Sequence, residues 1–426
     1  MALFALVDCN SFYCSCQRVF DPKLANVPVI VLSNNDGCII ARTSEAKALG
    51  IKMAEPYFKA RDIIQKNRVR VFSSNYALYA DMSARAVAVL GQFSPEIEVY
   101  SIDECFLDLE GFEHLDLIEY GQEIRARMLQ WTALPVCVGI GPTKTLAKLA
   151  NHFAKDDKTL NGVCDIRAFT SAQLDERLAR SSVNEVWGIG RRLTEKLNAL
   201  GIRSVLDLRN ANARDLSRRF SVVVERTVTE LCGESCLDLE EVAPTRKQII
   251  CSRSFGHRVE SLDDLIEAVN TYTTRAAEKL RAGGSTSAAV AVFAHTSLFQ
   301  PNQPTYSAGL TVPLVERTDD TRRLVQAAQR GLRAIYRPGY RYAKAGVMLL
   351  DLGAKGLKQG SLWEIEADPT KAAGLMETLD KVNRRMGSGT LTFAGGGVKK
   401  PWQMQRQAVS PCFTTRWDEL PEAKAR

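Results

Sequence analysis

The order of apolar segments between residues 1 and 165 restricts the fold more than any other feature of the sequence. Short apolar runs predict strands, and longer stretches with apolar residues at helical spacing predict helices. Residues 11–78 interrupt the series after its first strand, so we expect them to be an insertion. Without them the order is β-α-β-β-α-β followed by a helix, which is the ferredoxin-like order. The expected strands are 3–7, 97–100, 105–109 and 134–140, and the expected helices are 81–92, 114–130 and 142–155.

The rest of the chain changes character twice. Residues 171–232 predict short helices without strands and are rich in arginine. Pro244 and its charged neighbours are typical of a linker, and residues 249–352 again alternate between strand and helix patterns. From residue 353 onward the chain carries several glycine runs, and we expect a loosely ordered tail unless a partner holds it. The sequence therefore predicts an α+β protein with several compact parts.

Composition excludes several classes of protein. The 426 residues are 45% hydrophobic and 25% charged, which is typical of a folded globular protein, and the net charge of +7 is only mildly basic. No run of about 18 uncharged apolar residues occurs, so we expect no membrane span. Asp8 follows the start of the chain closely and no basic segment precedes it, so we expect no secretory signal. Eleven scattered cysteines without a CxxC pair, and four histidines, favour reduced thiols in the cytoplasm over disulfides or zinc.

Three acidic residues are candidates for chemistry. Asp8 ends the first predicted strand, and Asp103 and Glu104 stand between two strands expected to pair. Neighbouring residues on a regular strand point to opposite faces, so Asp103 and Glu104 can converge only at a turn or bulge. In the ferredoxin-like order the first strand lies beside that hairpin, which brings Asp8 near. Two Mg²⁺ ions would relieve the repulsion among three carboxylates and would support displacement at phosphorus; the alternative is that these are solvated turn acids.

Three lysines are candidates for binding phosphate. Lys144 and Lys148 lie one turn apart on the helix predicted at 142–155, away from its apolar positions. Lysines near a helix N-terminus oppose the helix dipole unless an anion such as a triphosphate binds there. Lys47, in the inserted segment, is a third candidate, and each lysine could instead be a solvated surface charge. Thr143 stands where a Walker loop requires glycine, so a P-loop is excluded.

The segment 186–192 fits a helix-hairpin-helix. Gly188 and Gly190 form a hydrophobic-Gly-x-Gly pattern between two predicted helices, and Arg191 and Arg192 follow. Such glycines let backbone N–H groups approach DNA phosphates whatever the base sequence. The alternative is an ordinary turn between helices.

Taken together, these motifs resemble those of the Y-family translesion DNA polymerases. The pairing of DCNSFY with YSIDE is specific to that family, and SNNDGC is similar to its UmuC branch. The resemblance runs from residue 1 into the tail. The matching segments are 8–13, 33–38, 41–50, 79–83, 100–104, 144–148 and 186–190.

The resemblance implies a right-hand polymerase with a ferredoxin-like palm, inserted fingers, a helical thumb, an α/β little finger and a C-terminal tail. It also implies an error-prone enzyme that copies damaged templates in the SOS response to DNA damage. The implied segments are palm 1–10 and 79–165, fingers 11–78, thumb 166–240, linker 241–249, little finger 250–352 and partner-binding tail 353–426.

The resemblance also implies roles for single residues. Asp8, Asp103, Glu104 and the backbone carbonyl of Cys9 would bind two Mg²⁺ ions, while deoxynucleoside triphosphates are the substrates. The ring of Tyr13 would occupy the space that a ribose 2′-hydroxyl needs.

Contacts with the triphosphate follow the same resemblance. Lys47 and Lys148 match positions that contact the triphosphate in the family. Many relatives carry a triphosphate-binding tyrosine where this chain has Ser44, and serine cannot span the same distance.

The tail carries a short motif of its own. Gln359, Leu362 and Trp363 belong to QGSLW, which is similar to the peptides that bind bacterial polymerases to the sliding clamp. The resemblance also implies primer-template DNA, a UmuD′-like dimer and RecA as partners, and no membrane. Two other functions stay open at this point: a nucleotidyl cyclase, which shares a two-metal palm, and a non-catalytic DNA-binding repair scaffold. Primer extension tests the scaffold, and product formation from ATP or GTP without DNA tests the cyclase.

Overall fold

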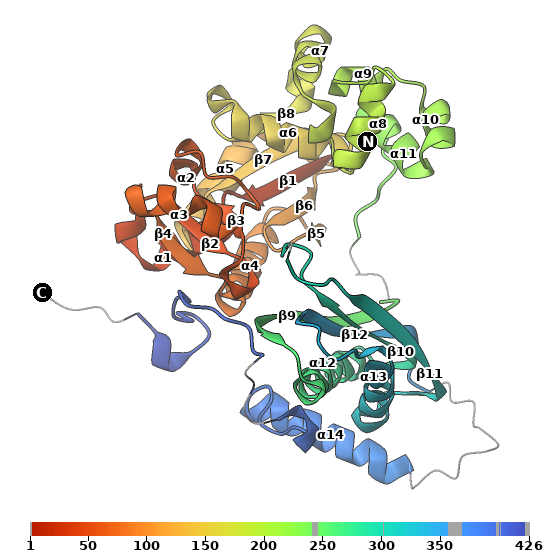
Figure 1. The fold of residues 1–426 in the computed structure, drawn as a ribbon. Coiled ribbons are helices and arrows are strands. Elements are labelled where there is room, and N and C mark those ends of the chain that lie inside the picture. Colours follow the sequence, from red (N-terminus) through yellow and green to blue (C-terminus); the bar gives the residue numbers. More distant parts are fainter. Residues whose placement is uncertain are drawn as a thin grey trace, which may run out of the picture. The chain divides into compact units, whose positions relative to one another are not determined.

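The computed structural model describes residues 2–240, 246–300, 302–356, 369–397, 400 and 402–421. Its contacts divide the chain into two compact units, whose helices and strands are labelled in Figure 1. The first unit comprises Met1–Ser33, Gly37–Ala243 and Ala408–Arg426, and the second comprises Asn34–Asp36 and Pro244–Gln407. Among the described residues, no helix combines the length and the apolar character that crossing a bilayer requires.

A five-stranded sheet with the order β5-β6-β1-β7-β8 forms the centre of the first unit. The predicted β-α-β-β-α-β series is present, and β8 adds a strand, parallel to β7, that the apolar pattern did not indicate. Helix α5 begins later than predicted because the Asp116 side chain accepts hydrogen bonds from the first backbone N–H groups of the helix. The elements are β1 (Phe4–Cys9), β5 (Ile97–Val99), β6 (Glu104–Asp108), β7 (Val136–Gly141), β8 (Val163–Asp165), α4 (Tyr76–Leu90), α5 (Leu117–Thr132) and α6 (Lys144–Asp156).

The alternation of β1 divides its side chains between two cores. Ala5 and Val7 pack in the large core that includes residues of α4 and α5. Phe4 and Leu6 face the other way and pack with residues of β6 and α6. Helix α6 lies so close to β7 that a Cβ on Gly139 would come within 2.0 Å of a backbone nitrogen of the helix. Glycine at this position therefore allows α6 to cover the face of the sheet toward which the even-numbered residues of β1 point.

The insertion after β1 folds around a second sheet in the same unit, with the order β3-β2-β4 and its own apolar core. The arginine-rich stretch is helical throughout, as predicted, and its core is continuous with apolar residues of α6. The elements of the insertion are α1 (Phe12–Phe20), β2 (Val29–Leu32), β3 (Ile39–Arg42), α2 (Ser44–Ala48), α3 (Tyr57–Lys66) and β4 (Arg70–Ser73). The helical stretch comprises α7 (Ser171–Arg180), α8 (Arg191–Ala199), α9 (Val205–Arg209), α10 (Ala213–Arg219) and α11 (Val222–Leu231).

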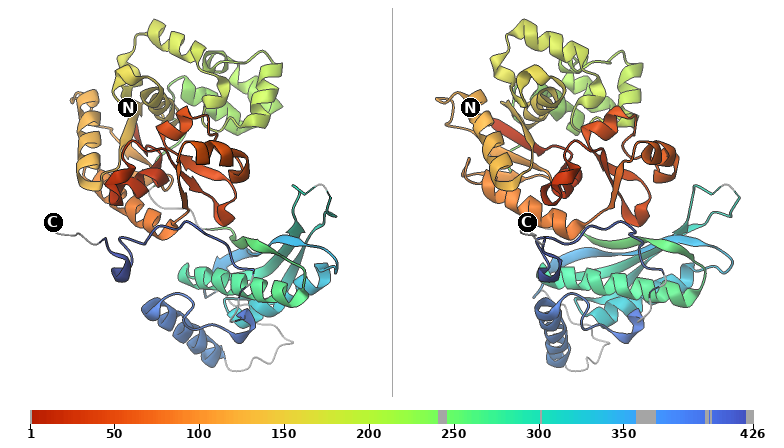
Figure 2. Two further views of the ribbon diagram at one scale, coloured as in Figure 1. Left: turned by 60° about the vertical axis from the view of Figure 1, so that its left-hand side comes forward. Right: turned by 90° about the vertical axis from the view of Figure 1, so that its left-hand side faces the viewer.

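The second unit is a four-stranded antiparallel sheet with the order β11-β10-β12-β9. Helices α12 and α13 pack on the same face of this sheet (Figure 2). Its element order up to β12 is also β-α-β-β-α-β, yet the first strand lies at an edge here, whereas β1 is central in the first unit. The elements are β9 (Ile249–Val259), α12 (Leu262–Ala282), β10 (Ser285–Thr296), β11 (Ser307–Thr318), α13 (Thr321–Ile335), β12 (Tyr342–Ala354) and α14 (Pro369–Met386).

The described residues of the tail are held in place by contacts with other parts of the chain. The expectation of loose order is therefore wrong for these residues. In α14, Asp380 accepts two hydrogen bonds from Arg281 of α12, at 2.6 and 2.7 Å. Trp402 packs edge-on against Tyr272, also on α12.

Beyond residue 407 the tail belongs to the first unit. There Phe413 stacks on Phe20 with the ring centroids 4.7 Å apart. The buried side-chain amide of Asn75 donates to the carbonyl oxygens of Ser410 and Pro411, and the Ser73 N–H donates to the Ala408 carbonyl. Apolar and hydrogen-bonded partners thus fix the described end of a tail for which loose order was expected.

Candidate active site

Two acidic residues face each other across the central sheet. Asp8 of β1 and Glu104 of β6 are direct partners in the antiparallel register. Leu6 lies two residues before Asp8 on β1, and Phe106 lies two residues after Glu104 on β6, and both pack in a core with Ala147 of α6. Because residues two apart on a strand point to the same face, the carboxylates also point to the α6 side of the sheet. Opposed residues in such a pair have Cβ atoms about 4.5–5.5 Å apart. The strand pairing therefore brings Asp8 and Glu104 together, as the topology predicted.

Asp103 lies in the turn just before β6. Its backbone carbonyl accepts a hydrogen bond of 2.9 Å from the Cys9 N–H, which ties the turn to the end of β1. Its carboxylate accepts a hydrogen bond of 2.6 Å from the Ser101 hydroxyl, and the same hydroxyl accepts from the N–H groups of Asp103 and Glu104. The irregular backbone that the sequence required between the two strands is thus stabilised by Ser101.

Lysines from α6 neutralise the two opposed acids. Lys155 Nζ lies 2.6 Å from Asp8 Oδ2, and Lys148 Nζ lies 2.7 Å from Glu104 Oε1. The two lysines are seven residues apart, which is nearly two helical turns and places them on the same face. Lys155 was missed by the sequence analysis, and this spacing from Lys148 is the signal that could have identified it.

Lys144 occupies a different environment from the one expected of a phosphate ligand. Its ammonium is buried, forms an ion pair with Glu98 of β5 and donates a hydrogen bond of 2.6 Å to the Asp238 carbonyl. Glu98 also accepts a hydrogen bond from the Glu240 N–H. Lys144 therefore joins the sheet to the segment that follows α11, and we do not retain it as a nucleotide ligand. An i, i+4 pair of lysines does not reveal which member the tertiary fold buries.

The protonation of Asp8 reflects its neighbours. Burial raises the pKa of the Asp8 carboxyl to about 6, the Lys155 ammonium opposes that rise, and the charges of Glu104 and Asp103 add to it. An acid that is costly to ionise beside two further acids is one that a cation would stabilise.

The carboxylates of these acids are suitable ligands for magnesium, although in this structure the lysine ammonium groups balance the charges of Asp8 and Glu104. In the described part of the chain, no three His, Cys, Asp or Glu side chains are grouped so as to hold a metal ion as they stand. Carboxylate oxygens and a backbone carbonyl are the hard donors that Mg²⁺ prefers. Lys155 and Lys148 are 34% and 26% exposed, so both ammonium groups can turn toward water when a divalent ion takes their place.

A cavity of about 500 Å³ opens beside the acids. Asp8, Cys9 and Asp103 line one part of it together with Asn10, Ile102 and Lys155, and residues of the inserted segment line the rest. Tyr13, at the start of α1, also lines the cavity, and its ring stacks on Tyr79 with centroids 4.5 Å apart. The structure thus places Tyr13 in the same cavity as three of the four predicted metal-binding residues, Asp8, Cys9 and Asp103.

The inserted segment supplies the polar wall of this cavity. Lys47 and Ser44 both belong to α2 and line it, and both are exposed. Arg42 of β3 lines it as well and donates to the Ile51 carbonyl. Lys47 is therefore the lysine of the inserted segment that is accessible from the cavity.

The predicted helix-hairpin-helix is the connection before α8. Gly188 has a φ of +86°, a conformation that side chains rarely adopt, so the fold itself favours glycine there. Gly190 is the N-cap of α8, has a φ of −83°, and a Cβ there would touch nothing within 4 Å. Arg191 and Arg192 are exposed, and Arg191 pairs with Glu195 of its own helix. The fold therefore does not require glycine at 190.

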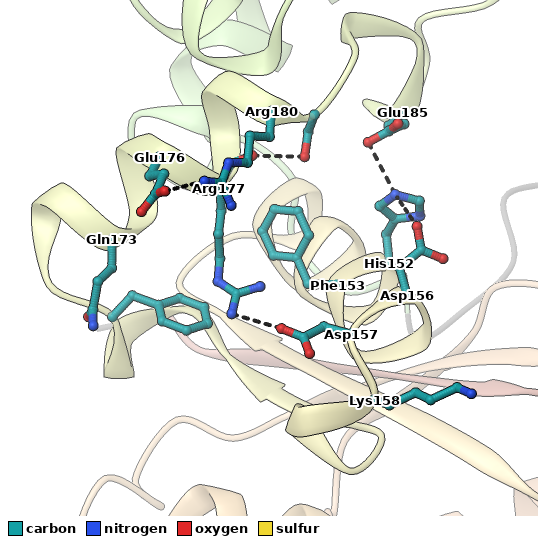
Figure 3. Close-up of a pocket in the computed structure, with 12 residues that line it drawn as sticks. His152, Phe153, Asp156, Asp157, Lys158, Gln173, Glu176, Arg177, Arg180 and Glu185 are labelled. Carbon is teal, nitrogen blue, oxygen red and sulfur yellow. Dashed lines mark hydrogen bonds and ion pairs between the residues drawn. The ribbon is translucent and has the colours of Figure 1, made fainter.

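A second cavity, of about 670 Å³, lies between the end of α6 and α7 (Figure 3). Side chains pair across it: the Arg177 guanidinium lies 2.9 Å from the Asp157 carboxylate, and His152 Nε2 lies 3.1 Å from Glu185 Oε2. Neither pairing leaves a group directed at a ligand, so we assign this cavity no role.

The predicted clamp-binding residues Gln359, Leu362 and Trp363 lie outside the described residues.

Comparisons with known protein families agree along most of the chain. The model of the impB/mucB/samB family matches residues 7–152, and the model of the C-terminal domain of that family matches residues 246–362. A domain of unknown function matches residues 373–423, which include most of α14 and most of the tail segment on the first unit.

Single proteins give the same result. The chain is 48% identical over 427 residues to the protein UmuC of Salmonella typhimurium (strain LT2), with 99% of this chain and 100% of that protein covered. It is 33% identical over 224 residues to DNA polymerase IV of Ectopseudomonas mendocina, covering 52% and 61% of the two chains. A solved Y-family DNA polymerase chimera of Dbh and Dpo4 superposes with a TM-score of 0.65 at 21% identity, over 83% of this chain and 99% of that one. The predicted α+β polymerase fold is confirmed.

Proposed function

The chain belongs to the impB/mucB/samB family and is a translesion DNA polymerase of the Y family, and from this premise we propose that Asp8, Asp103 and Glu104 form its catalytic centre. The observation that carries the proposal is the register of β1 and β6, which sets Asp8 opposite Glu104 beneath two lysines of α6. The relatives favour this activity over the nucleotidyl cyclase and the non-catalytic scaffold.

Asp8, Asp103, Glu104 and the backbone carbonyl of Cys9 would hold two Mg²⁺ ions. When bound, the ions lower the pKa of the primer 3′-hydroxyl and stabilise the pyrophosphate that leaves. Glu104 would bind metal in place of the Lys148 ammonium, and Asp8 would do so in place of the Lys155 ammonium. The lysines therefore act as internal counterions while the site holds no metal, and they keep two opposed carboxylates from repelling each other.

The cavity beside the acids would receive the incoming deoxynucleoside triphosphate. Tyr13 excludes a ribose 2′-hydroxyl through the bulk of its ring, which Tyr79 holds in place. Lys47 and the freed Lys148 contact the triphosphate. Ser44, on the same wall, is too short for the contact that a tyrosine makes in many relatives and leaves more room in the cavity.

The parts of the chain take the roles of a right-hand polymerase. Palm (1–10 and 79–165), fingers (11–78) and thumb (166–240) belong to the first unit apart from Asn34–Asp36 and, with the hairpin at Gly188 and Gly190, grip primer-template DNA. The little finger (250–352) follows a linker (241–249), and the tail (353–426) is a partner-binding segment.

Several partners complete the proposal. Gln359, Leu362 and Trp363 bind the sliding clamp, since a leucine and an aromatic ring can fill an apolar pocket. A UmuD′-like dimer and RecA are the other partners expected of this family, and the enzyme acts on DNA in the cytoplasm during the SOS response.

Primer extension tests the catalytic centre. Asp103→Ala and Glu104→Ala should reduce extension to below about a hundredth of the wild-type rate, since losing a metal ligand costs several kcal/mol of transition-state stabilisation. Binding of primer-template DNA should change little. Asp108→Asn is a matched control, because Asp108 lies on the same strand and accepts a hydrogen bond from the Glu110 N–H. Extension by Asp103→Ala at more than about a tenth of the wild-type rate would contradict the assignment.

A further inference from the structure

An aromatic cluster connects the hairpin before α8 to the strand that carries Glu104. The Trp187 indole N–H donates a hydrogen bond of 3.0 Å to the Tyr100 hydroxyl, and the two rings meet edge to face at 5.3 Å. Phe106 of β6 lies 6.1 Å from Trp187 and 5.8 Å from Tyr100. All three residues belong to the first unit. Trp187 directly precedes Gly188, so the first residue of the hairpin turn is fixed to the sheet.

The cluster also holds a lysine of the catalytic centre. Lys148 Nζ lies 4.6 Å from the centre of the Tyr100 ring and 5.7 Å from that of Trp187, within the range of cation–π attraction. The same ammonium pairs with Glu104 at 2.7 Å. Two aromatic faces and one carboxylate therefore determine where the Lys148 ammonium lies.

The aromatic contacts do not depend on the carboxylate. Tyr100 is 40% exposed and Trp187 is half-buried, so neither ring is a core residue that packing alone would explain. If Glu104 turns to a metal ion, both ring faces still attract the ammonium, because the attraction comes from the ring quadrupoles. Lys148 would then stay near the site with its charge directed at an anion.

We propose that Trp187 and Tyr100 are positioning residues for Lys148, and that through them the hairpin couples its grip on DNA to the binding of the incoming nucleotide. The inference rests on the proposed function, in which Lys148 contacts the triphosphate and the hairpin contacts DNA phosphates. A displacement of the hairpin moves the Trp187 ring, and the Lys148 ammonium loses one of its two aromatic faces.

Equilibrium binding of a deoxynucleoside triphosphate to the full-length protein on a dideoxy-terminated primer-template measures this coupling without chemistry. Trp187→Ala should raise the dissociation constant of the nucleotide about tenfold. Trp187→Phe, which keeps a ring, should stay within about threefold of wild type, and Tyr100→Phe, which loses only the hydroxyl, should be similar. In extension assays Trp187→Ala should raise KM much more than it lowers kcat.

A double-mutant cycle identifies Lys148 as the residue through which Trp187 acts. In a Lys148→Met background, Trp187→Ala should have almost no further effect on nucleotide binding. Trp131→Ala is the matched control, since Trp131 also lies beside a cation, Arg127, but on α5, and it should bind nucleotide as wild type does.

Different results would overturn the positioning role of Trp187 and the proposed function. A full tenfold loss that persists in the Lys148→Met background would overturn the positioning role, as would unchanged binding by Trp187→Ala. Extension that survives Asp103→Ala would overturn the proposed function itself, whatever Trp187→Ala does. Thermal melting of Trp187→Phe shows that the fold is intact where Trp187→Ala alone could be unstable.

Discussion

Asp8 shows how a single residue can be unfavourable for folding and necessary for function. Its carboxyl is 14% exposed and faces Glu104 across a strand pair, where like charges destabilise a sheet. Lys155 offsets this repulsion in part. A site with such a residue is prepared for a cation at some cost to the stability of the protein without metal.

We therefore predict that Asp8→Asn abolishes extension yet stabilises the metal-free protein at pH 8. Because folding raises the pKa of Asp8 to about 6, the ionised carboxyl opposes folding. This penalty is absent below about pH 4 and fully present above about pH 6, where it amounts to about 3 kcal/mol. Thermal melting of both proteins with chelator, at pH 8 and near pH 4.5, checks the prediction.

The stabilisation by Asp8→Asn should shrink toward zero at the lower pH. Asp108→Asn, on the partner strand, should have the same effect at both values. A stabilisation by Asp8→Asn that is independent of pH would assign the gain to something other than the charge.

Tyr13 is expected to control the choice between deoxyribonucleotides and ribonucleotides. Tyr13→Ala should admit ribonucleotides at a rate at least about tenfold above wild type, because its ring is the bulk that the 2′-hydroxyl would meet. Single-nucleotide insertion with ribo- and deoxyribonucleotides measures it. Tyr76→Ala is the control, since Tyr76 meets the Tyr13 ring edge-on and does not line the cavity. Unaltered discrimination in Tyr13→Ala would reduce Tyr13 to a packing residue.

The sequence predicted which acids could act, but it predicted their lysine partners only in part. Asp8 and Glu104 follow from where strands end and how they pair, which apolar patterns reveal. Lys144 and Lys148 are equivalent by helical spacing, and only the position of Glu98 on β5 decides that Lys144 is buried. That position depends on strand order, which no local pattern encodes.

At the scale of elements, the hairpin before α8 gives a prediction that separates binding from folding. Gly190→Ala should weaken DNA binding severalfold for all sequences, because the added methyl group stands where a phosphate approaches the backbone. Its melting temperature should match wild type, since the new Cβ has ordinary φ and no neighbour within 4 Å. Gly188→Ala should lower both binding and melting temperature, since φ there is +86°. Fluorescence anisotropy at fixed salt and thermal melting check both variants.

If Gly190→Ala binds DNA as tightly as wild type, the hairpin is an ordinary turn between helices.

A comparison of the two sheets shows that the same order of helices and strands along the chain can give different orders of strands in the sheet. Both follow the order β-α-β-β-α-β, which the apolar runs predicted for the first unit. The strand orders differ nonetheless: β1 lies between β6 and β7, while β9 lies at an edge beside β12. The choice depends on which strand faces pack on which helices, and that involves residues far apart in the chain. The order of the elements, and with it the place of β1 beside β6, could therefore be predicted, while the edge position of β9 could not.

The proposed clamp-binding residues of the tail affect synthesis by the whole molecule. Leu362→Ala combined with Trp363→Ala should abolish stimulation by the sliding clamp, because about 2 kcal/mol or more of apolar anchoring is lost. Synthesis without the clamp should stay within about twofold of wild type, since tethering acts by raising the effective concentration of enzyme at the primer end. Primer extension with and without clamp checks this. A double mutant that responds fully to the clamp would mean that the contact lies elsewhere in the chain.

The return of the tail to the first unit also has a consequence in time. Residues 408–421 are synthesised after the whole of the second unit, yet they supply partners for Ser73, Asn75 and Phe20, which are made among the first 75 residues. At about 5–20 residues per second, the nascent first unit waits roughly 10–30 s for its last segment. A ribosome that stops early would release a chain whose first unit still exposes the surface that residues 408–421 cover in the finished protein. Proteases that remove incomplete proteins could bind this exposed surface and so distinguish an unfinished chain from a finished one.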